Sequence, residues 1–495
     1  MKTIEMINAR ARKPEWSMAE PVNFCLEEGE HIAIIGRNGA GKSMFVDMIT
    51  GRHPAFPDMV KYAFDEPYNN LKHISFRDTY GGDNDRTYFL QQRWNQMEID
   101  EETPTVGSKL EEAFQLANST VVGDLKSPTS ERRAFQKHLY ELFHLEDLLD
   151  KYIILLSSGE LRKFKLAASL FTHPKVLIME NPFIGLDAQT RDQLKTLLSM
   201  LAREQGLQII LVLAKTDEIP AFITHIVEVK DMKVLPKVSV ECRTESEEFV
   251  TAVPSGKGLA AANSPLSTLN SPLPKSEVIR FNNVSIRYGS RTILKDLDWT
   301  VRKGEHWSLS GENGSGKSTL LSLVCADNPQ SYACDISLFG HKRGSGESIW
   351  DIKRHIGYVS PEMHRSYKQN IPAIQIVASG LKDSVGLYVR PHEAEKEQCR
   401  RWMNIFGIGH LADRRFLEMS SGEQRLVLVA RAFVKNPDLL ILDEPLHGLD
   451  DYNRRKVKDI VDEYCQNPDV TLIYVTHYQE ELPRCIDHSL FLERH

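Results

Sequence analysis

The chain has 495 residues, of which 41% are hydrophobic and 26% charged, a composition typical of a globular protein large enough for two or more domains. The formal net charge of −7 gives no reason to expect nucleic acid or an anionic membrane as partner, and seven scattered cysteines favour a reducing compartment over a disulfide scaffold. No run of about 18 apolar residues occurs, so we expect a cytoplasmic protein, at most peripheral at the inner face of a membrane.

The first motif lies at residues 36–43, GRNGAGKS, and fits the phosphate-loop pattern G-x-x-x-x-G-K-S. Glycines let the backbone wrap around phosphates, the lysine neutralises their charge, and the last hydroxyl can bind Mg²⁺. The sequence therefore predicts a nucleotide site here, with Ser43 also as a metal ligand. Its nucleotide-binding residues are Gly36, Asn38, Gly39, Gly41, Lys42 and Ser43.

Further along, residues 157–160, SSGE, are small hydroxyl residues and a glycine at the start of a helix, where backbone N–H groups and the helix dipole can face an anion. Ser158 and Gly159 are the predicted contacts. Leucines at 194, 197, 198 and 201 predict an amphipathic helix packed on the core, followed by an apolar strand at 209–213.

Residues 239–276 are poor in aromatic side chains and rich in Ser, Pro, Ala and Gly, which predicts a flexible linker. The chain then divides into a first domain at 1–238, this linker, and a second domain at 277–495.

The second half repeats the first. Residues 311–318, GENGSGKS, form a second phosphate loop, and each loop follows a Gly-Glu-His tripeptide, at 29–31 and at 304–306. The lysines of the two loops, Lys42 and Lys317, set the offset between the copies at 275. The strand-like residues 307–310 before the second loop and the apolar positions 320, 321 and 324 after it support a strand–loop–helix unit. Its predicted nucleotide-binding residues are Gly311, Asn313, Gly314, Gly316, Lys317, Ser318 and Thr319, with Ser318 also a ligand of Mg²⁺.

The stretch Met419–Asp450 combines two further parts of the chemistry. Ser421 and Gly422 open a helix as Ser158 and Gly159 do. The apolar run at 439–442 predicts a strand buried on both faces, which delivers Asp443 and Glu444 to the carboxyl edge of a sheet. Asp443 can hold Mg²⁺ through water, and Glu444 can orient or deprotonate an attacking water.

These motifs resemble those of the ATP-binding cassette (ABC) ATPases: a signature at 420–424, Walker A at 311–318, Walker B at 440–444, and a trailing histidine, His477. The resemblance implies two α/β P-loop cassettes with ATP and Mg²⁺ sandwiched head to tail, each cassette supplying Walker motifs to one site and its signature to the other. It also implies that His477 contacts the γ-phosphate, and that Glu444, His477 and Lys317 are the catalytic residues.

From the signature onward the copies align without gaps at an offset of 263, so the losses of the first copy can be identified residue by residue. Glu180 stands where the second copy has Asp443, Asn181 where it has Glu444, and Ala214 where it has His477. Asn181 cannot accept a proton, whereas Glu180 can still reach a magnesium ion. We expect the first Walker site to bind nucleotide and hydrolyse it poorly.

Two more departures concern coupling and adenine binding. Family members place a glutamine after the strand at 356–359, but here Ser-Pro-Glu follows, while the first copy offers Gln91 or Gln92. Tyr288 is placed to stack on adenine in the second copy. The corresponding stretch of the first copy gives Lys13, with Trp16 as a looser candidate that could equally be a core residue.

The tandem plan, the SSGE signatures, the degenerate first Walker B and residues 378–388 resemble the ModF-type group, which is named for an association with molybdate transport. The first functional hypothesis is an ATPase subunit that energises integral-membrane permease subunits on another chain. The second is a soluble ATP-switched factor acting on ribosomes or nucleic acid, a reading that the short linker and the acidic charge oppose. A structural ATP-binding protein with little turnover is the third. We expect the two cassettes to face each other within the chain, with residues 158–159 near Lys317 and residues 421–422 near Lys42.

Overall fold

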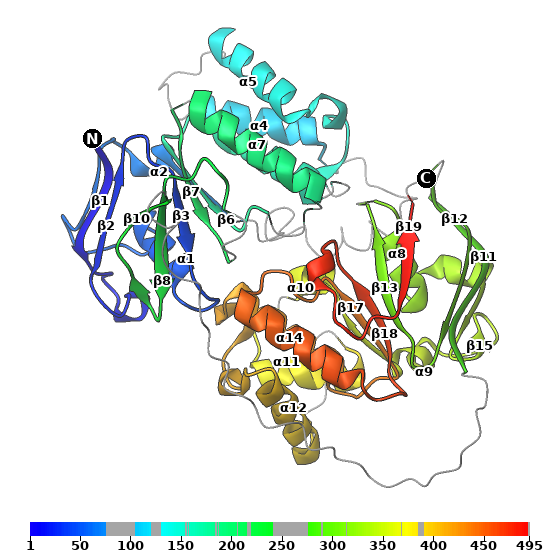
Figure 1. The fold of residues 1–495 in the computed structure, drawn as a ribbon. Coiled ribbons are helices and arrows are strands. Elements are labelled where there is room, and N and C mark those ends of the chain that lie inside the picture. Colours follow the sequence, from blue (N-terminus) through cyan, green and yellow to red (C-terminus); the bar gives the residue numbers. More distant parts are fainter. Residues whose placement is uncertain are drawn as a thin grey trace.

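The computed structural model describes residues 1–75, 104–119, 130–153, 156, 158–183, 186, 188–204, 206–214, 219–240, 276–288, 291–312, 314–367, 369–384 and 391–493. They form two cassettes that lie side by side, one up to residue 240 and one from residue 276 (Figure 1). Asn313, Gln91, Gln92 and most of the expected linker lie outside the described residues. The division at 238 and 277 therefore stays a prediction.

The core of the first cassette is a parallel sheet in the order β8-β3-β7-β6-β5. Every residue of β6 and β7 is buried, as apolar strands covered on both faces should be. The parallel strands are β3 (Ile32–Ile35), β5 (Leu71–Ser75), β6 (Val176–Glu180), β7 (Gln208–Val212) and β8 (His225–Lys230).

Short antiparallel strands and helices surround that sheet in the described part of the chain. The antiparallel strands are β1 (Lys2–Ala9), β2 (Val22–Glu27) and β4 (Val60–Tyr62) in a sheet of their own, and β9 (Lys233–Val234) and β10 (Val238–Ser239) beside β8. The helices are α1 (Lys42–Ile49), α2 (Pro67–Asn70), α4 (Val106–Ser119), α5 (Ser130–Phe143), α6 (Ser158–Leu170) and α7 (Ala188–Glu204).

The second cassette repeats this plan with a parallel sheet in the order β19-β13-β18-β17-β16. Its parallel strands are β13 (His306–Gly311), β16 (Ile356–Val359), β17 (Leu439–Asp443), β18 (Thr471–Val475) and β19 (His488–Leu492). A separate antiparallel sheet contains β11 (Glu277–Tyr288), β12 (Arg291–Arg302), β14 (Asp335–Leu338) and β15 (His341–Lys342). The helices are α8 (Lys317–Val324), α9 (Ile349–Lys353), α10 (Pro361–Ser366), α11 (Ala373–Ser379), α12 (Glu393–Ile405), α13 (Ser421–Phe433) and α14 (Asp451–Tyr464).

The matching strand orders confirm the internal repeat and the α/β fold class. In each cassette the phosphate loop follows the strand at the second position of the sheet, β3 or β13, and the Walker B carboxylate ends β6 or β17, two strands away. Loops at the carboxyl edge of a parallel sheet converge, so this topology places the phosphate-binding loop and the acidic residues in one region.

The strand register corrects one expectation. β5 pairs with β6 as β16 pairs with β17, so Ser75 is the counterpart of Ser360, each following the last paired apolar residue. The expectation that Gln91 or Gln92 directly follows the equivalent strand is therefore wrong, because β5 already ends at Ser75, well before either glutamine.

The predicted amphipathic helix is present as α7, and its leucines at 194, 197, 198 and 201 are buried. The corresponding helix of the second cassette, α14, buries Val457, Ile460 and Val461 in the same way. Among the described residues, no helix has the length and apolar character that crossing a membrane requires.

Candidate nucleotide sites

The two phosphate loops have nearly the same backbone. Gly41 at φ 104° and Gly316 at φ 98° precede α1 and α8, whose first residues are Lys42 and Lys317. Lys42 Nζ donates to the carbonyls of residues 36 and 37 at 2.6 and 2.9 Å, and Lys317 Nζ donates to those of residues 311 and 312 at the same distances. Each lysine therefore lies across its own loop, where bound phosphates would compete for it.

Close backbone approach explains why the first glycine of each loop cannot carry a side chain. A Cβ on Gly36 would lie 2.2 Å from the carbonyl oxygen of Val229, and one on Gly311 would lie 2.5 Å from that of Leu492. Both glycines also have φ near 150°, a region that L-residues rarely adopt. The backbone of the neighbouring strand, β8 in the first cassette and β19 in the second, thus packs directly against the loop.

The second Walker site brings Glu444 and His477 together. His477 Nε2 lies 3.3 Å from Glu444 Oε1, and both side chains are largely buried. Burial alone would raise the pKa of Glu444, but the hydrogen bond from His477 and the nearby charges of His447 and Arg425 outweigh it and lower the pKa to about 2. Glu444 is therefore a carboxylate at neutral pH, which is the form that a general base requires.

Asp443 has the opposite electrostatic setting. Burial raises its pKa well above the usual value, and the neighbouring carboxylates of Glu362 and Glu444 add to that effect, while Arg425 and Lys317 oppose it. Carboxylate and hydroxyl oxygens are the ligands that Mg²⁺ prefers, and a buried group of carboxylates is stabilised by a divalent cation. The chemistry of Asp443 and its neighbouring carboxylates therefore suits a magnesium ion, and Ser318 as a further ligand stays a prediction. Glu362 was not among the predicted metal ligands.

The first Walker site has the same backbone turn after its strand as the second, but it carries different side chains. Glu180 is 8% exposed at the end of β6, where Ser75 Oγ donates to it at 3.4 Å and His73 Nε2 lies 3.5 Å from its Oε1. Asn181 has φ 49°, close to φ 47° at Glu444, and the two N–H groups donate to Val212 and Val475 at 2.8 and 2.9 Å. The same left-handed turn thus presents an amide in one cassette and a carboxylate in the other.

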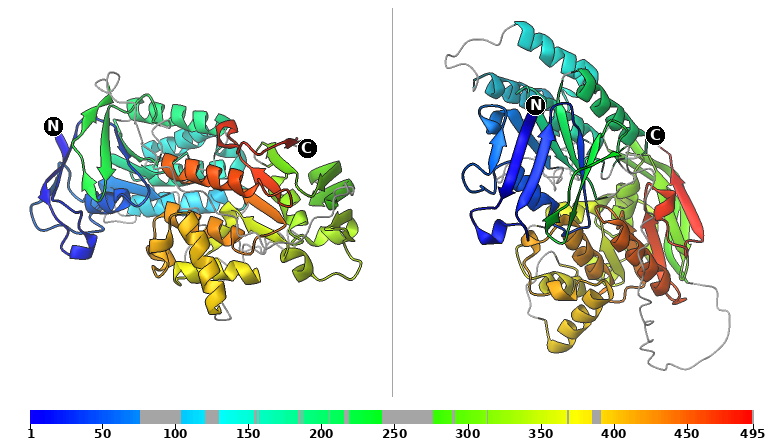
Figure 2. Two further views of the ribbon diagram at one scale, coloured as in Figure 1. Left: turned by 60° about the horizontal axis from the view of Figure 1, so that its bottom comes forward. Right: turned by 60° about the vertical axis from the view of Figure 1, so that its left-hand side comes forward.

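The phosphate loop of the first cassette touches the second cassette directly. The N–H of Asn38 donates to Asp450 Oδ2 at 2.8 Å, and its side-chain amide donates to the carbonyl of Gly448 at 2.9 Å. Burial lowers the pKa of Lys42 to about 8, although Asp450 across this contact and Glu180 act in the opposite direction. Figure 2 shows the two cassettes next to each other in two further views.

Gly422 of the second signature lies against the same asparagine. A Cβ on Gly422 would be 1.8 Å from Asn38 Nδ2, so any other residue at position 422 would force the Asn38 side chain to move. Gly422 therefore lies against the first phosphate loop at Asn38, while the expected approach of residues 421–422 to Lys42 itself stays a prediction. On the other side, the Tyr478 hydroxyl donates to the carbonyl of Leu186 at 3.4 Å, which brings the chain next to His477 against the first cassette. Nothing is described for the side chains of Ser158 and Gly159.

The second signature helix begins with a capping box. Ser420 N donates to Glu423 Oε2 at 2.8 Å, and Glu423 N donates to Ser420 Oγ at 3.3 Å. The serine and the glutamate of this SSGE motif thus fix the entry to α13, in addition to the anion contact that the sequence predicts.

Arg425 is a residue that the sequence reasoning missed. It is fully buried, and its guanidinium donates to the carbonyls of Ser360 at 2.9 Å and Asp443 at 2.8 Å, and also to that of Glu444. It thereby ties the signature helix to the Walker B turn and to the segment after β16. A signal was present, because Arg162 occupies the equivalent position in the first copy, 425 − 263 = 162, and is also buried.

The aromatic candidates for adenine have other contacts. The Tyr288 hydroxyl accepts a hydrogen bond from Asn328 at 3.0 Å, and the ring packs on the second core. Trp16 stacks on His53 with centroids 4.7 Å apart, with Lys13 over its ring at 4.2 Å. Adenine stacking by Tyr288 or Trp16 stays a prediction.

Comparison with known proteins gives a consistent result. The family model described as "ABC transporter" matches residues 19–184 and 294–447. The chain is 33% identical over 500 residues to the ABC transporter ATP-binding protein ModF of Escherichia coli, an alignment that covers 99% of this chain and 96% of ModF. It is 28% identical over 501 residues to an uncharacterized ABC transporter ATP-binding protein of Schizosaccharomyces pombe, covering 99% of this chain and 98% of that protein.

Among solved structures, the archaeal ribosome recycling factor aABCE1, in complex with the stalk protein aP1, matches with a TM-score of 0.52 at 16% identity. The match covers 98% of this chain and 87% of that chain. At this identity the likeness concerns the fold alone.

Proposed function

Because this chain belongs to the family of ABC transporter ATP-binding proteins and is an ABC-type ATPase with two cassettes, we propose that it binds two Mg-ATP molecules between its own cassettes and hydrolyses ATP mainly at the second Walker site. The observation that carries this proposal is the 3.3 Å contact between His477 and Glu444, for which the first cassette has only Ala214 and Asn181.

In the proposed mechanism, Lys317 and the glycine-rich loop hold the phosphates, and Ser318 with Asp443 would hold Mg²⁺, which would neutralise developing charge on the phosphates. Glu444, kept ionised by His477, accepts the proton of the attacking water. Arg425 orients the turn that carries Asp443 and Glu444, through the carbonyls of both.

The first site serves as a clamp in this proposal. Lys42, Ser43 and Glu180 hold Mg-ATP, while Asn181 leaves the bound water without a base. The contact of Asn38 with Gly448 and Asp450 supports this role, because it joins the first phosphate loop to the second cassette. Slow exchange at the first site would then keep the cassettes together during turnover at the second.

We propose that ATP hydrolysis drives a separate membrane permease, since the relative's name places it among ABC transporter proteins. A molybdate-type anion is the first substrate class to test, because the ModF-type group is named for an association with molybdate transport. This proposal places the chain in the cytoplasm, at the inner face of the membrane when bound to the permease.

One observation favours the alternative, a soluble factor acting on ribosomes or nucleic acid. The segment that carries the coupling glutamine in transporters is replaced here by residues 360–362, and Ser360 is fixed to its own cassette: its hydroxyl accepts from Met363 N at 3.1 Å and its carbonyl from Arg425. Such a segment is poorly suited to move with a permease.

The test is to identify what the closed chain binds. A Glu444→Gln variant, isolated with ATP from detergent-solubilised cells, is compared by mass spectrometry with a Lys42→Ala/Lys317→Ala variant that cannot hold nucleotide. Permease subunits enriched only with the Glu444→Gln variant would support the transport proposal, whereas ribosomal or nucleic-acid-binding proteins would support the alternative. The proposed site chemistry is refuted if the Glu444→Gln chain still hydrolyses ATP at the wild-type rate.

A further inference from the structure

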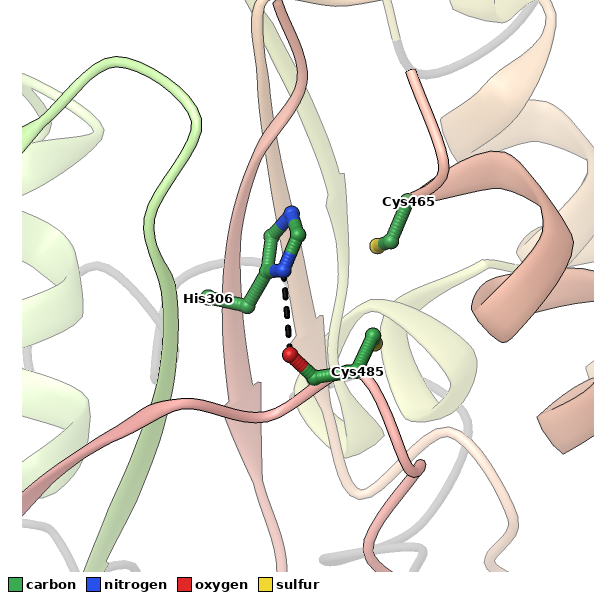
Figure 3. Close-up of side chains that lie close together, drawn as sticks. All are labelled: His306, Cys465 and Cys485. Carbon is green, nitrogen blue, oxygen red and sulfur yellow. Dashed lines mark hydrogen bonds between the residues drawn. The ribbon is translucent and has the colours of Figure 1, made fainter. Parts of the chain in front are cut away.

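Three side chains that bind soft metal ions converge in the second cassette, away from the nucleotide sites (Figure 3). His306 is the first residue of β13, Cys465 caps the C-terminus of α14, and Cys485 lies in the segment before β19. A ring nitrogen of the histidine and the two sulfur atoms lie within 4.8 Å of one another. His306 and Cys465 are buried, and Cys485 is half-buried.

The backbone at each of these residues is held in place. His306 N donates to Asp487 Oδ1 at 2.8 Å, and Cys485 N donates to Asp462 Oδ1 at 3.0 Å. Cys465 N continues the hydrogen bonding of α14 by donating to Val461 at 2.9 Å. The three segments therefore meet in a fixed arrangement, and only side-chain rotations remain free to adjust.

Each ring nitrogen of His306 faces a backbone carbonyl oxygen. Nδ1 lies 3.0 Å from the carbonyl oxygen of Cys485, and Nε2 lies 3.2 Å from that of Val470. A neutral imidazole has a single N–H, so only one of these contacts is a hydrogen bond. The other nitrogen keeps its lone pair, the form in which histidine binds a metal, and binding would require the ring to turn that nitrogen from its carbonyl oxygen toward the ion.

The first cassette provides an internal comparison. The counterpart of His306 is His31, 306 − 275 = 31, but Cys465 and Cys485 correspond to Ala202 and Phe222 at the offset of 263. There the edge of the Phe222 ring meets His31 at 5.6 Å, and His31 Nδ1 accepts from Ile209 N at 3.2 Å. The fold can thus be completed with apolar groups at this place, and the second cassette has two thiols instead.

We propose that His306, Cys465 and Cys485 bind one zinc ion, with water as the fourth ligand. Two thiolates and an imidazole are a typical zinc set, with metal–ligand bonds of about 2.0 to 2.3 Å. Ligand atoms on such a tetrahedron are roughly 3.5 to 3.8 Å apart, so the group has to contract by about 1 Å at most. Binding replaces the two thiol protons: Zn²⁺ and two R–SH give Zn(SR)₂ and two H⁺.

The position of the group indicates a bracing role. His306 begins β13, whereas the phosphate loop follows its other end, so the ion would lie at the opposite edge of the sheet from ATP. It would join the end of α14, which begins directly after the interface residue Asp450, to the strands β13 and β19. The inference does not depend on which partner the ATPase serves.

The experiment uses the full chain, reduced, freed of metal with a chelator and titrated with Co²⁺, whose thiolate complexes absorb strongly. We expect a sulfur-to-cobalt charge-transfer band that saturates at one ion per chain, is removed by Zn²⁺, and is accompanied by proton release and a higher midpoint of thermal unfolding. Cys485→Ser should weaken binding by at least about tenfold, since even the loss of residues that only support metal ligands costs that much. Cys399→Ser, at a buried thiol in α12 outside this group, is the matched control and should bind Co²⁺ as the unaltered chain does.

A second variant, Cys465→Ser, should weaken Co²⁺ binding in the same way. Cys485→Ser is the safer of the two for folding, because Cys485 is only half-buried whereas Cys465 is buried. A reduced chain that shows no charge-transfer band would overturn the proposal. Unchanged affinity for Co²⁺ in Cys485→Ser would overturn it too. So would a disulfide between residues 465 and 485 in a chain that, once reduced, binds no metal.

Discussion

Gly422 and Asn38 lie so close across the two cassettes that Gly422→Ala is expected to open the first nucleotide site. The added Cβ would be 1.8 Å from Asn38 Nδ2 and 2.4 Å from its Cγ, far inside any normal contact distance. Asn38 would have to turn away, and its hydrogen bond to the carbonyl of Gly448 at 2.9 Å would be lost.

The loss of stability of the closed state follows from the lost hydrogen bond and the steric clash. A net hydrogen bond contributes about 1 kcal/mol, and forcing a methyl group into a packed contact costs about 1 to 3 kcal/mol. The closed state should therefore lose at least about 2 kcal/mol, which corresponds to roughly a thirtyfold change in the closing equilibrium.

The assay is the release of labelled ATP from the first site, followed by rapid filtration in a Glu444→Gln background so that chemistry does not interfere. Gly422→Ala should release ATP at least about tenfold faster, since part of the lost closing energy appears in the off-rate. Adding Asn38→Gly removes the clashing side chain and should restore much of the retention. Unchanged release in Gly422→Ala, or a double variant no slower than the single one, would refute this account of the interface.

Three other predictions concern the Walker sites. Glu444→Gln should lower phosphate release by at least about a hundredfold, whereas Asn181→Ala should change it by less than about twofold; equal losses in both would show that both sites turn over. In His477→Ala, burial is no longer opposed by the hydrogen bond, so the pKa of Glu444 rises and the acid limb of the rate–pH profile should move to higher pH, an outcome contradicted by a profile that is merely lower in height. The pKa of Lys42 is about 8, and bound phosphates raise it, so ATP binding at pH 9 should take up about one proton. Calorimetry in two buffers of different ionisation enthalpy measures this uptake, and Lys42→Ala should remove it.

The parts of the fold that could be predicted are those determined by local spacing. The phosphate loops, the apolar strand before Asp443 and the helical stripes of α7 and α14 each depend on residues within one short segment. Spacing within such a segment fixes the backbone that it can adopt, and the two loops differ by only a few degrees in φ at their glycines.

The placement of Gln91 and Gln92 after the equivalent strand was wrong because two neighbouring segments of the first copy differ in length from the second copy in opposite directions. The segment from the loop lysine to the serine after the apolar strand is shorter in the first copy, Lys42 to Ser75, than in the second, Lys317 to Ser360. The segment from that serine to the signature glutamate is longer in the first copy, by more than the first segment is shorter. In the sequence the net excess looks like a single insertion, and only strand pairing separates the two changes.

Contacts between distant segments could not be predicted for a related reason. The hydrogen bond of Asn38 to Asp450 joins residues 412 positions apart. The approach of His306 to Cys465 and Cys485 depends on where β13 begins, where α14 ends and how the segment before β19 runs. No periodicity in the sequence encodes such meetings. The roles of the individual site residues remain predictions that the experiments above test.

The left-handed turn shared by Asn181 and Glu444 bears on how the first cassette evolved. Asparagine tolerates φ near +50° better than glutamate does, by an amount on the order of 1 kcal/mol. A change from glutamate to asparagine at such a turn therefore relieves backbone strain as it takes the carboxylate away. A reversion to glutamate would restore that strain immediately, yet would gain little catalysis while Ala214 stands in place of the histidine. Selection would need both changes together, so the asymmetry between the two cassettes is easier to acquire than to reverse.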